Sequence, residues 1–349
     1  MFALEAIKLF VPTIVSFGLG MIISPILIDF LIANKLWKKK NVALAIDGSL
    51  ATISNALYDD EKRQTPRMGG IVVWVSVLVT SLLFWVLAKL GNVPELDFIS
   101  RSQTWLPLAT MVFGALVGLV DDFAVTGNLG TYIGGGISLK TRIGLVGLLG
   151  AATGYWFYIK LGISSVVLPF FGAINLGIFF IPFLILVMVA IFSGGIIDGI
   201  DGLSGSIMSS VFGAYSLIAL YNHQTDIAAF CLVTMGAILA FLWYNIPPAK
   251  YYMSETGMLG LTTALTVIAF MTNAVGVLPI IAFPLFTASG SSILQIASKK
   301  LRKGKKVFLV APVHNHFQAK GMAGHTVTMR YWIVSFICAL LGVIIHIIG

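Results

Sequence analysis

Ten stretches of this chain are long and apolar enough to form membrane-spanning helices. A bilayer core of about 30 Å requires about 20 mainly apolar residues per helix, and the 349 residues are 58% hydrophobic and only 10% charged. This composition is typical of a polytopic membrane protein. We therefore expect an all-α fold that forms a single transmembrane domain over residues 1–349. The ten runs lie near residues 9–32, 69–90, 105–120, 142–160, 176–196, 203–221, 227–245, 257–273, 276–297 and 330–348.

The basic residues are distributed unevenly between the connections that join these runs. When the connections are numbered in chain order, 18 of the 22 Lys and Arg residues fall on the odd-numbered side. The positive-inside rule then places the odd connections in the cytoplasm and both termini outside. The formal net charge of +8 is concentrated on that face, where it would attract anionic lipid headgroups or phosphorylated substrates, while nucleic acid is a poor partner for so embedded a chain. The 18 basic residues on the odd-numbered side are Lys35, Lys38, Lys39, Lys40, Lys62, Arg63, Arg67, Lys140, Arg142, Lys250, Lys299, Lys300, Arg302, Lys303, Lys305, Lys306, Lys320 and Arg330.

Aspartates occur in pairs where apolar runs meet the basic connections. The pairs are Asp59 and Asp60, Asp121 and Asp122, and Asp198 and Asp201. Charge at a membrane edge usually marks a functional site, and a shared cation is the simplest way to neutralise several carboxylates. Magnesium prefers carboxylate, phosphate and water oxygens, so the pattern indicates magnesium and phosphate chemistry. The alternative is that these are helix-cap aspartates that face water.

Spacing limits how the aspartates can point. Neighbouring residues on a helix point about 100° apart, so Asp121 and Asp122 cannot share one helix direction. One can face a metal while the other faces substrate or a basic partner. Asp198 and Asp201 would share one face of a helix, although the glycines at 199 and 202 favour a bent helix end.

Further candidate residues fall on the same predicted cytoplasmic face, namely Asn245, Glu255, His314 and His316. The two histidines are two residues apart and face one side only in an extended segment, a start that Pro312 favours. Because they lie in the most basic connection, we expect them to contact a phosphate or nucleotide. The alternative is a solvated basic loop in which the histidines are incidental.

The glycine-rich stretch from Gly127 to Arg142 lacks the GKS or GKT ending of a phosphate-binding loop. We expect a flexible cytoplasmic loop whose Lys140 and Arg142 reach substrate phosphates. Residues 43–62 are expected to form a short surface helix.

Six separated motifs together resemble those of the phospho-N-acetylmuramoyl-pentapeptide transferases (translocase I). The match runs in the family's order from about Lys62 to the C-terminus. The two aspartate motifs are shared with the wider superfamily of polyprenyl-phosphate N-acetylhexosamine-1-phosphate transferases (glycosyltransferase family 4), and the histidine motif favours the muramoyl-pentapeptide branch. The motifs are KRQTPRMGG (62–70), GLVDDF (118–123), IDGIDGLSG (197–205), FLWYNIPPA (241–249), SSILQ (291–295) and APVHNHFQAKG (311–321).

The resemblance implies a ten-helix enzyme of the inner (plasma) membrane, with its active site facing the cytoplasm. Such an enzyme moves phospho-N-acetylmuramoyl-pentapeptide from UDP onto undecaprenyl phosphate, which gives UMP and lipid I for peptidoglycan synthesis. Magnesium is the implied cofactor, and a homodimer is the implied assembly.

The resemblance also implies roles for single residues. Asp121, Asp122 and Asp198 match the family's catalytic and metal-binding aspartates. Glu255 stands where the family has a metal-binding aspartate, because this chain reads SETGM where the family reads GDVGS, and Arg142 stands where a loop lysine is expected. The implied substrate-binding residues are Lys62, Thr65, Asp201, Asn245, His314 and His316, with Lys140 and Arg142 from the glycine-rich loop.

Three alternatives stay open at this point. A sibling transferase that uses UDP-N-acetylglucosamine or a related donor would share the fold, the metal and the lipid. A transporter would be favoured by prolines within spans, at Pro25, Pro182 and Pro284, but it predicts midplane charges or an internal repeat, and neither is seen. An inactive homologue would be favoured by Glu255.

Overall fold

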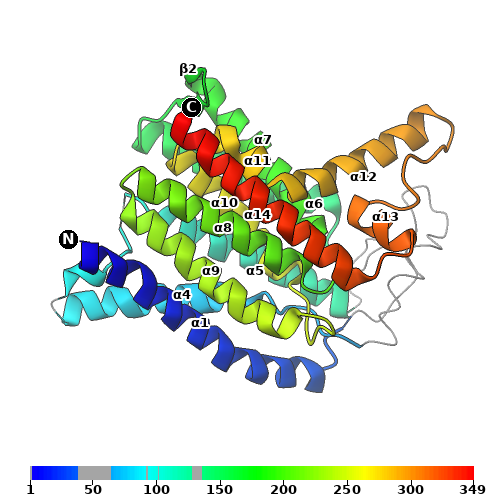
Figure 1. The fold of residues 1–349 in the computed structure, drawn as a ribbon, viewed down its shortest axis with the longest axis horizontal. Helices are drawn as coiled ribbons and strands as arrows, with labels where there is room; N and C mark the ends of the chain where they lie inside the picture. Colours follow the sequence, from blue (N-terminus) through cyan, green and yellow to red (C-terminus); the bar gives the residue numbers. More distant parts are fainter. Residues whose placement is uncertain (1, 38–63, 92, 101, 128–135) are drawn as a thin grey trace.

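The computed structural model describes residues 2–37, 64–91, 93–100, 102–127 and 136–349 (Figure 1). The predicted surface helix at 43–62 and the predicted substrate-binding residue Lys62 lie outside these ranges. The described chain is mostly helical. Its α-helices are α1 (Phe2–Ala33), α4 (Ile71–Leu90), α5 (Trp105–Gly127), α6 (Leu139–Tyr155), α7 (Phe180–Ser193), α8 (Leu203–Tyr221), α9 (Thr225–Asn245), α10 (Ser254–Met271), α11 (Leu278–Ile281), α12 (Phe283–Leu301), α13 (Val313–Ala319) and α14 (Gly324–Ile348).

Eight of the described helices are long and apolar enough to cross a membrane, and a ninth span would be the pair formed by α11 and α12, which is bent by 78°. The predicted run at 142–160 is also helical: α6 continues into a π-helical turn, η2 (Trp156–Lys160). All ten predicted runs therefore coincide with helices, although α6, with 17 residues, is not among the eight helices that are long and apolar enough to cross a membrane. Apolar side chains are widely exposed on α1 and α14, as expected of surfaces that face lipid.

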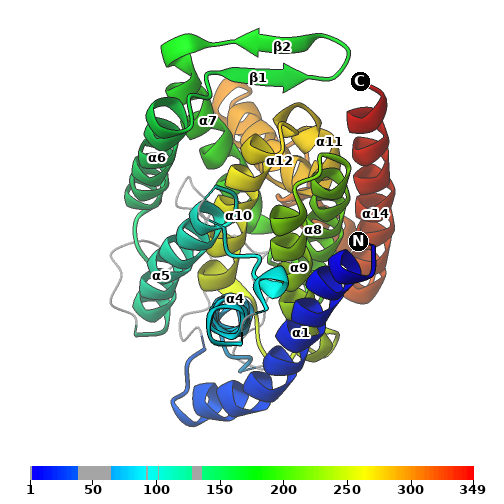
Figure 2. The ribbon, with the colours of Figure 1, turned by 90° about the vertical axis from the view of Figure 1, so that its left-hand side faces the viewer.

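A short β-hairpin is the one sheet in the described part of the chain. Strand β1 (Ser165–Leu168) pairs antiparallel with β2 (Gly172–Asn175), with Ser165 opposite Asn175. The hairpin lies across one end of the helix bundle (Figure 2). Both termini lie at that same end, and the amide of Phe170 donates a hydrogen bond to the C-terminal carbonyl of Gly349 (Figure 1).

Helix α10 forms the centre of the bundle. Buried residues make up 89% of its apolar window, against 22% for α14 and 28% for α1. Because other helices enclose it, α10 can carry polar residues, and the hydroxyls of Thr262, Thr263 and Thr266 donate to backbone carbonyls. Figure 2 shows α10 between α5, α4 and α8. The first turn of α10 thereby lies beside the last turns of α5 and the starts of α4 and α8.

Helix α5 is longer than the apolar run that predicts it. The run ends near residue 120, whereas α5 continues to Gly127 and carries Asp121 and Asp122 within its last turns. Both aspartates are buried there. The helix can continue because arginines and backbone N–H groups satisfy the two carboxylates, as described next.

Candidate active site

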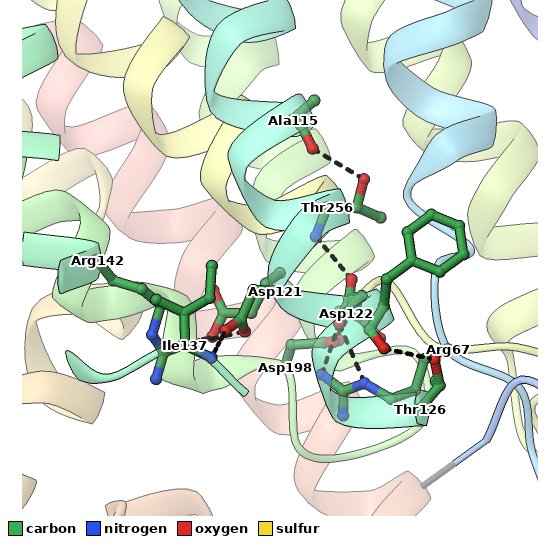
Figure 3. Close-up of polar contacts among 12 residues, drawn as sticks. Arg67, Ala115, Asp121, Asp122, Thr126, Ile137, Arg142, Asp198 and Thr256 are labelled. Atoms are coloured by element: carbon green, nitrogen blue, oxygen red, sulfur yellow. Dashed lines mark hydrogen bonds and ion pairs between the residues drawn. The ribbon is translucent and has the colours of Figure 1, made fainter. Parts of the chain in front are cut away.

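Asp121 and Asp122 point to opposite sides of α5 (Figure 3). The Asp121 Oδ1 accepts a hydrogen bond from the Ile137 amide at 2.6 Å, and its Oδ2 lies 3.5 Å from Arg142 Nη1. The Asp122 Oδ1 accepts hydrogen bonds from Arg67 Nε at 3.1 Å and Nη2 at 3.0 Å. The prediction that the two neighbouring aspartates do not share one helix direction is confirmed.

The first turn of α10 joins two of the carboxylates. The Thr256 amide donates to Asp122 Oδ2 at 2.9 Å, and the Ser254 amide donates to Asp198 Oδ2 at 2.7 Å. The first N–H groups of a helix have no partner within the helix, and the helix dipole favours negative charge there. Two aspartates from other parts of the chain therefore cap α10 and are held by it.

Two glycines allow the helices to come this close. A Cβ at Gly118 of α5 would overlap the carbonyl oxygen of Glu255 in α10. A Cβ at Gly70, just before α4, would overlap the backbone of Gly257. The GLVDDF and RMGG motifs thus supply both the charged residues and the space that brings them together.

Asp198 and Asp201 lie in the turn between η4 (Gly194–Ile197), a 3-10 helix, and α8. Gly202 has φ +78°, in the left-handed region, so the predicted bent helix end is confirmed. The Asp198 Oδ1 accepts from Ser204 Oγ at 2.7 Å, whereas Asp201 Oδ2 accepts from the Ala249 amide at 3.1 Å. Burial raises the pKa of Asp198, although the hydrogen bonds from Ser204 and Ser254 oppose that rise.

Asn245 connects two loops of the site. Its Oδ1 accepts from the Gly202 amide at 2.9 Å, and its Nδ2 donates to the Tyr251 carbonyl at 2.8 Å. The side chain is buried. In this structure Asn245 therefore positions the Asp198–Asp201 turn relative to the segment that leads into α10.

Glu255 and Arg142 complete the cluster. Arg142 Nη1 donates to Glu255 Oε1 at 2.6 Å, and the same nitrogen lies 3.5 Å from Asp121. On the other side, burial lowers the pKa of Arg67, but the carboxylates of Asp122, Glu255 and Asp198 outweigh burial and raise it. We call the four acidic residues Asp121, Asp122, Asp198 and Glu255 the carboxylate cluster.

The carboxylate cluster is only partly neutralised by the two arginines. Four carboxylates carry a charge of −4 when ionised, and two guanidinium groups leave −2, which is the charge that one divalent cation would neutralise. The donors are all carboxylate oxygens, which suit magnesium. In the described residues no three His, Cys, Asp or Glu side chains converge as a metal site would require. The donor type and the charge fit magnesium, but in this structure the arginines bind the carboxylates and no three of the carboxylates converge.

The structure corrects the prediction for the histidines. His314 and His316 lie in a helix, α13, and not in an extended segment, so they point away from one another. His314 is fully buried against Tyr331, and among the described residues neither ring nitrogen has a hydrogen-bond partner. His316 Nδ1 accepts from the Leu309 amide at 3.1 Å. Neither ring contacts the carboxylate cluster.

The remaining predicted residues surround the site less closely. Thr65 is partly buried two residues before Arg67, and Lys140 is exposed in the first turn of α6. Sequence reasoning gave no role to Arg67, Ser204 or the amides of α10. The signal available for Arg67 was a basic residue two positions before a glycine pair at the start of a span. Nothing in the sequence marks backbone amides.

Known proteins are similar to this chain over the regions that carry the six sequence motifs. Residues 104–273 match the family described as glycosyl transferase family 4. A protein of Geobacillus sp. (strain WCH70) is 32% identical over 345 residues, which cover 96% of each chain. Proteins of Chloroflexus aurantiacus (strain J-10-fl) and Chloroflexus aggregans are each 31% identical over 291 residues, or 80% of this chain and 76% of each relative. All three carry the name phospho-N-acetylmuramoyl-pentapeptide-transferase.

Proposed function

We propose that this chain, which belongs to the phospho-N-acetylmuramoyl-pentapeptide transferase family, transfers phospho-N-acetylmuramoyl-pentapeptide from UDP to undecaprenyl phosphate in peptidoglycan synthesis. The products are lipid I and UMP. The observation that carries the proposal is the identity of 32% over 96% of the chain, because it spans all six motifs. The resemblance inferred from those motifs is confirmed.

The reaction exchanges one phosphorus–oxygen bond for another. A phosphate oxygen of the lipid forms a bond to the sugar-linked phosphorus of the donor. The bond from that phosphorus to the oxygen bridging to the uridine-linked phosphate breaks, and UMP leaves with the electron pair. A phosphate monoester has a second pKa of about 6 and is mostly dianionic at neutral pH. The protein must therefore chiefly bring anions together and neutralise them.

We propose that Asp121, Asp122, Asp198 and Glu255 hold magnesium for this purpose. When bound, magnesium would neutralise and polarise the donor diphosphate. The support is the uncompensated charge of the carboxylate cluster and its purely oxygen donors. Glu255 keeps a carboxylate at this position, and the side chain is held beside the cluster by the hydrogen bond from Arg142.

The other candidate residues would bind the substrates. Arg67 and Arg142 offer guanidinium groups that suit phosphate oxygens, and their present carboxylate partners fix their positions. We assign donor or lipid contacts also to Lys62, Thr65, Asp201 and His316, which lie in the family motifs, and to Lys140 of the glycine-rich loop. The buried side chains of Asn245 and His314 would act by packing within the fold.

We propose that the carboxylate cluster faces the cytoplasm. The Asp198–Asp201 turn lies beside the first turns of α14, where Thr328 Oγ1 donates to the Asp201 carbonyl, whereas the C-terminal end of α14 contacts the hairpin. The basic connections are concentrated on the cluster's side of the predicted topology. A lipid phosphate lies at the membrane surface, so an acceptor of this kind requires a site at the helix ends. We also propose a homodimer in the plasma membrane.

UMP release by the purified chain tests the proposal. Undecaprenyl phosphate and magnesium would be supplied with either UDP-N-acetylmuramoyl-pentapeptide or UDP-N-acetylglucosamine. We expect turnover with the muramoyl donor only, and we expect chelation of magnesium to stop it. Turnover with only the other donor would overturn the proposed substrate, and turnover that survives chelation would overturn the proposed cofactor.

A further inference from the structure

Arg142 binds two carboxylates that come from different helices. Its Nη1 lies 2.6 Å from Glu255 Oε1 at the start of α10 and 3.5 Å from Asp121 Oδ2 near the end of α5. Only 15% of the Arg142 side chain is exposed. One nitrogen thus stands between two groups that would otherwise repel each other.

The position of Arg142 is fixed by the start of α6. Ser138 is the N-cap residue, and its Oγ accepts a hydrogen bond from the Thr141 amide at 3.2 Å. Arg142 is the next residue along, and its amide donates to the Ser138 carbonyl. The guanidinium is therefore held on a defined helical turn beside the cluster.

Arg67 and Arg142 hold their carboxylates differently. Arg67 donates two hydrogen bonds, from Nε and Nη2, to one oxygen of Asp122. Arg142 uses a single nitrogen for both of its partners, one of them at 3.5 Å, and among the described residues its buried Nε has no partner. Arg142 is thus bonded less completely than Arg67, although it neutralises two carboxylates.

We propose that Arg142 is a tethered counter-cation that occupies the space between Asp121 and Glu255 and leaves it when a divalent cation binds. The inference rests on the proposed function, because the cation is the one proposed for the transfer. Cation binding would then free the guanidinium, whose donors suit the phosphates of the substrates. Loading the cation and presenting an anion-binding group would be a single event.

Cation affinity tests the displacement directly. Binding of Mn²⁺ alone to the purified full chain would be followed from the spectrum of the free ion in electron paramagnetic resonance, and Mg²⁺ would then compete for the site. We expect Arg142→Met to bind Mn²⁺ about tenfold more tightly, because a competing positive charge is removed. Arg142→Lys, which keeps the charge, should stay within about threefold of the unsubstituted chain.

Lys160→Met is the matched control, since it removes one positive charge from the other end of the same helical segment, where the side chain is exposed. Its affinity should equal that of the unsubstituted chain. Unchanged or weaker binding in Arg142→Met would overturn the inference, because a purely structural or substrate-binding arginine predicts that result. Absence of Mn²⁺ binding in the unsubstituted chain would instead overturn the proposed cofactor.

A measurement on the unsubstituted chain covers the case in which Arg142→Met does not fold. Phenylglyoxal modifies accessible arginine side chains, and the modified peptides can be quantified by mass spectrometry. We expect Mg²⁺ to increase modification of Arg142 several-fold, whereas the exposed Arg302 reacts equally with and without Mg²⁺. Equal modification of Arg142 in both conditions would contradict the displacement.

Discussion

Ser254 has φ +58°, in the left-handed region that residues with a Cβ rarely adopt. This backbone geometry accompanies the hydrogen bond from its amide to Asp198 Oδ2. The family sequence that this chain resembles has glycine at this position. Residue 254 thus carries backbone strain beside a proposed metal ligand.

We predict that Ser254→Gly raises the unfolding free energy by about 1 kcal/mol, because glycine adopts positive φ without steric cost. Thermal unfolding in detergent would show a melting temperature higher by about 2 °C. Ser254→Ala, which keeps the Cβ, is the control and should not be stabilised. A lower melting temperature for Ser254→Gly than for Ser254→Ala would contradict the strain.

His314 is buried as a neutral side chain, and burial lowers its pKa to about 4 from an ordinary value of 6.5. Between these values the unfolded chain binds a proton that the folded chain does not. The stability contributed by the neutral ring is therefore fully present above pH 6.5 and is lost as the pH falls to about 4.

His314→Phe should remove this acid sensitivity, which amounts to about 3 kcal/mol across that range. Melting temperatures measured from pH 7 to pH 4 would show a flatter profile for the variant than for the unsubstituted chain. His325→Phe, at an exposed position, is the control and should keep the original slope. Parallel profiles for all three proteins would be inconsistent with a buried neutral His314.

Single residues differ in how well the sequence predicts them. The aspartates could be recognised because a carboxylate beside a long apolar run seldom has a purely structural role. Arg67 could not be given a role, because only the fold brings it to Asp122, which is 55 positions away. The spacing of His314 and His316 was misinterpreted, because the choice between helix and extended chain there depends on tertiary packing.

Among the elements, α5 and α10 determine the geometry of the site. Gly118 allows α5 to lie directly against the Glu255 carbonyl in the first turn of α10. Separation of the two helices would move the amide of Thr256 away from Asp122 and Glu255 away from Asp121. Misplacement of reacting groups by about 1 Å can cost about 100-fold in rate.

We predict that Gly118→Ala lowers UMP release at least about tenfold and destabilises the chain by about 1–3 kcal/mol, because its methyl group has no space. Activity and melting temperature measured on the same preparation would check both effects. Gly18→Ala in α1 is the control, since nothing lies within 4 Å of the added carbon. Full activity in Gly118→Ala would show that close contact between α5 and α10 is unnecessary.

Elements were predicted well where hydropathy alone decides them. The end of α5 was predicted too early, because Asp121 and Asp122 lower local hydropathy although the bundle satisfies them. The hairpin was missed, since its eight strand residues lie within a long uncharged apolar stretch, although Pro169 and Gly172 mark the turn. The 78° bend before α12 was not predicted either, although Pro284 marks the place.

At the scale of the whole molecule, the polar chemistry is concentrated at one end of an apolar bundle. Helix α13 and the start of α14, which contacts the Asp198–Asp201 turn, lie towards that end, and the termini and hairpin lie at the other (Figure 1). The sequence predicts this division because acidic pairs and basic connections alternate with the spans in a regular order. It does not predict which carboxylate binds which arginine, since those pairs depend on helix packing.

The central claim is that the carboxylate cluster carries out the transfer, and UMP release by Asp198→Asn tests it most directly. The amide keeps the shape of the side chain but removes its charge, so turnover with the muramoyl donor should fall about 1000-fold. Asp226→Asn, which removes a carboxylate paired with Lys8 away from the cluster, is the control and should retain activity. Near-normal turnover by a folded Asp198→Asn protein would contradict the account.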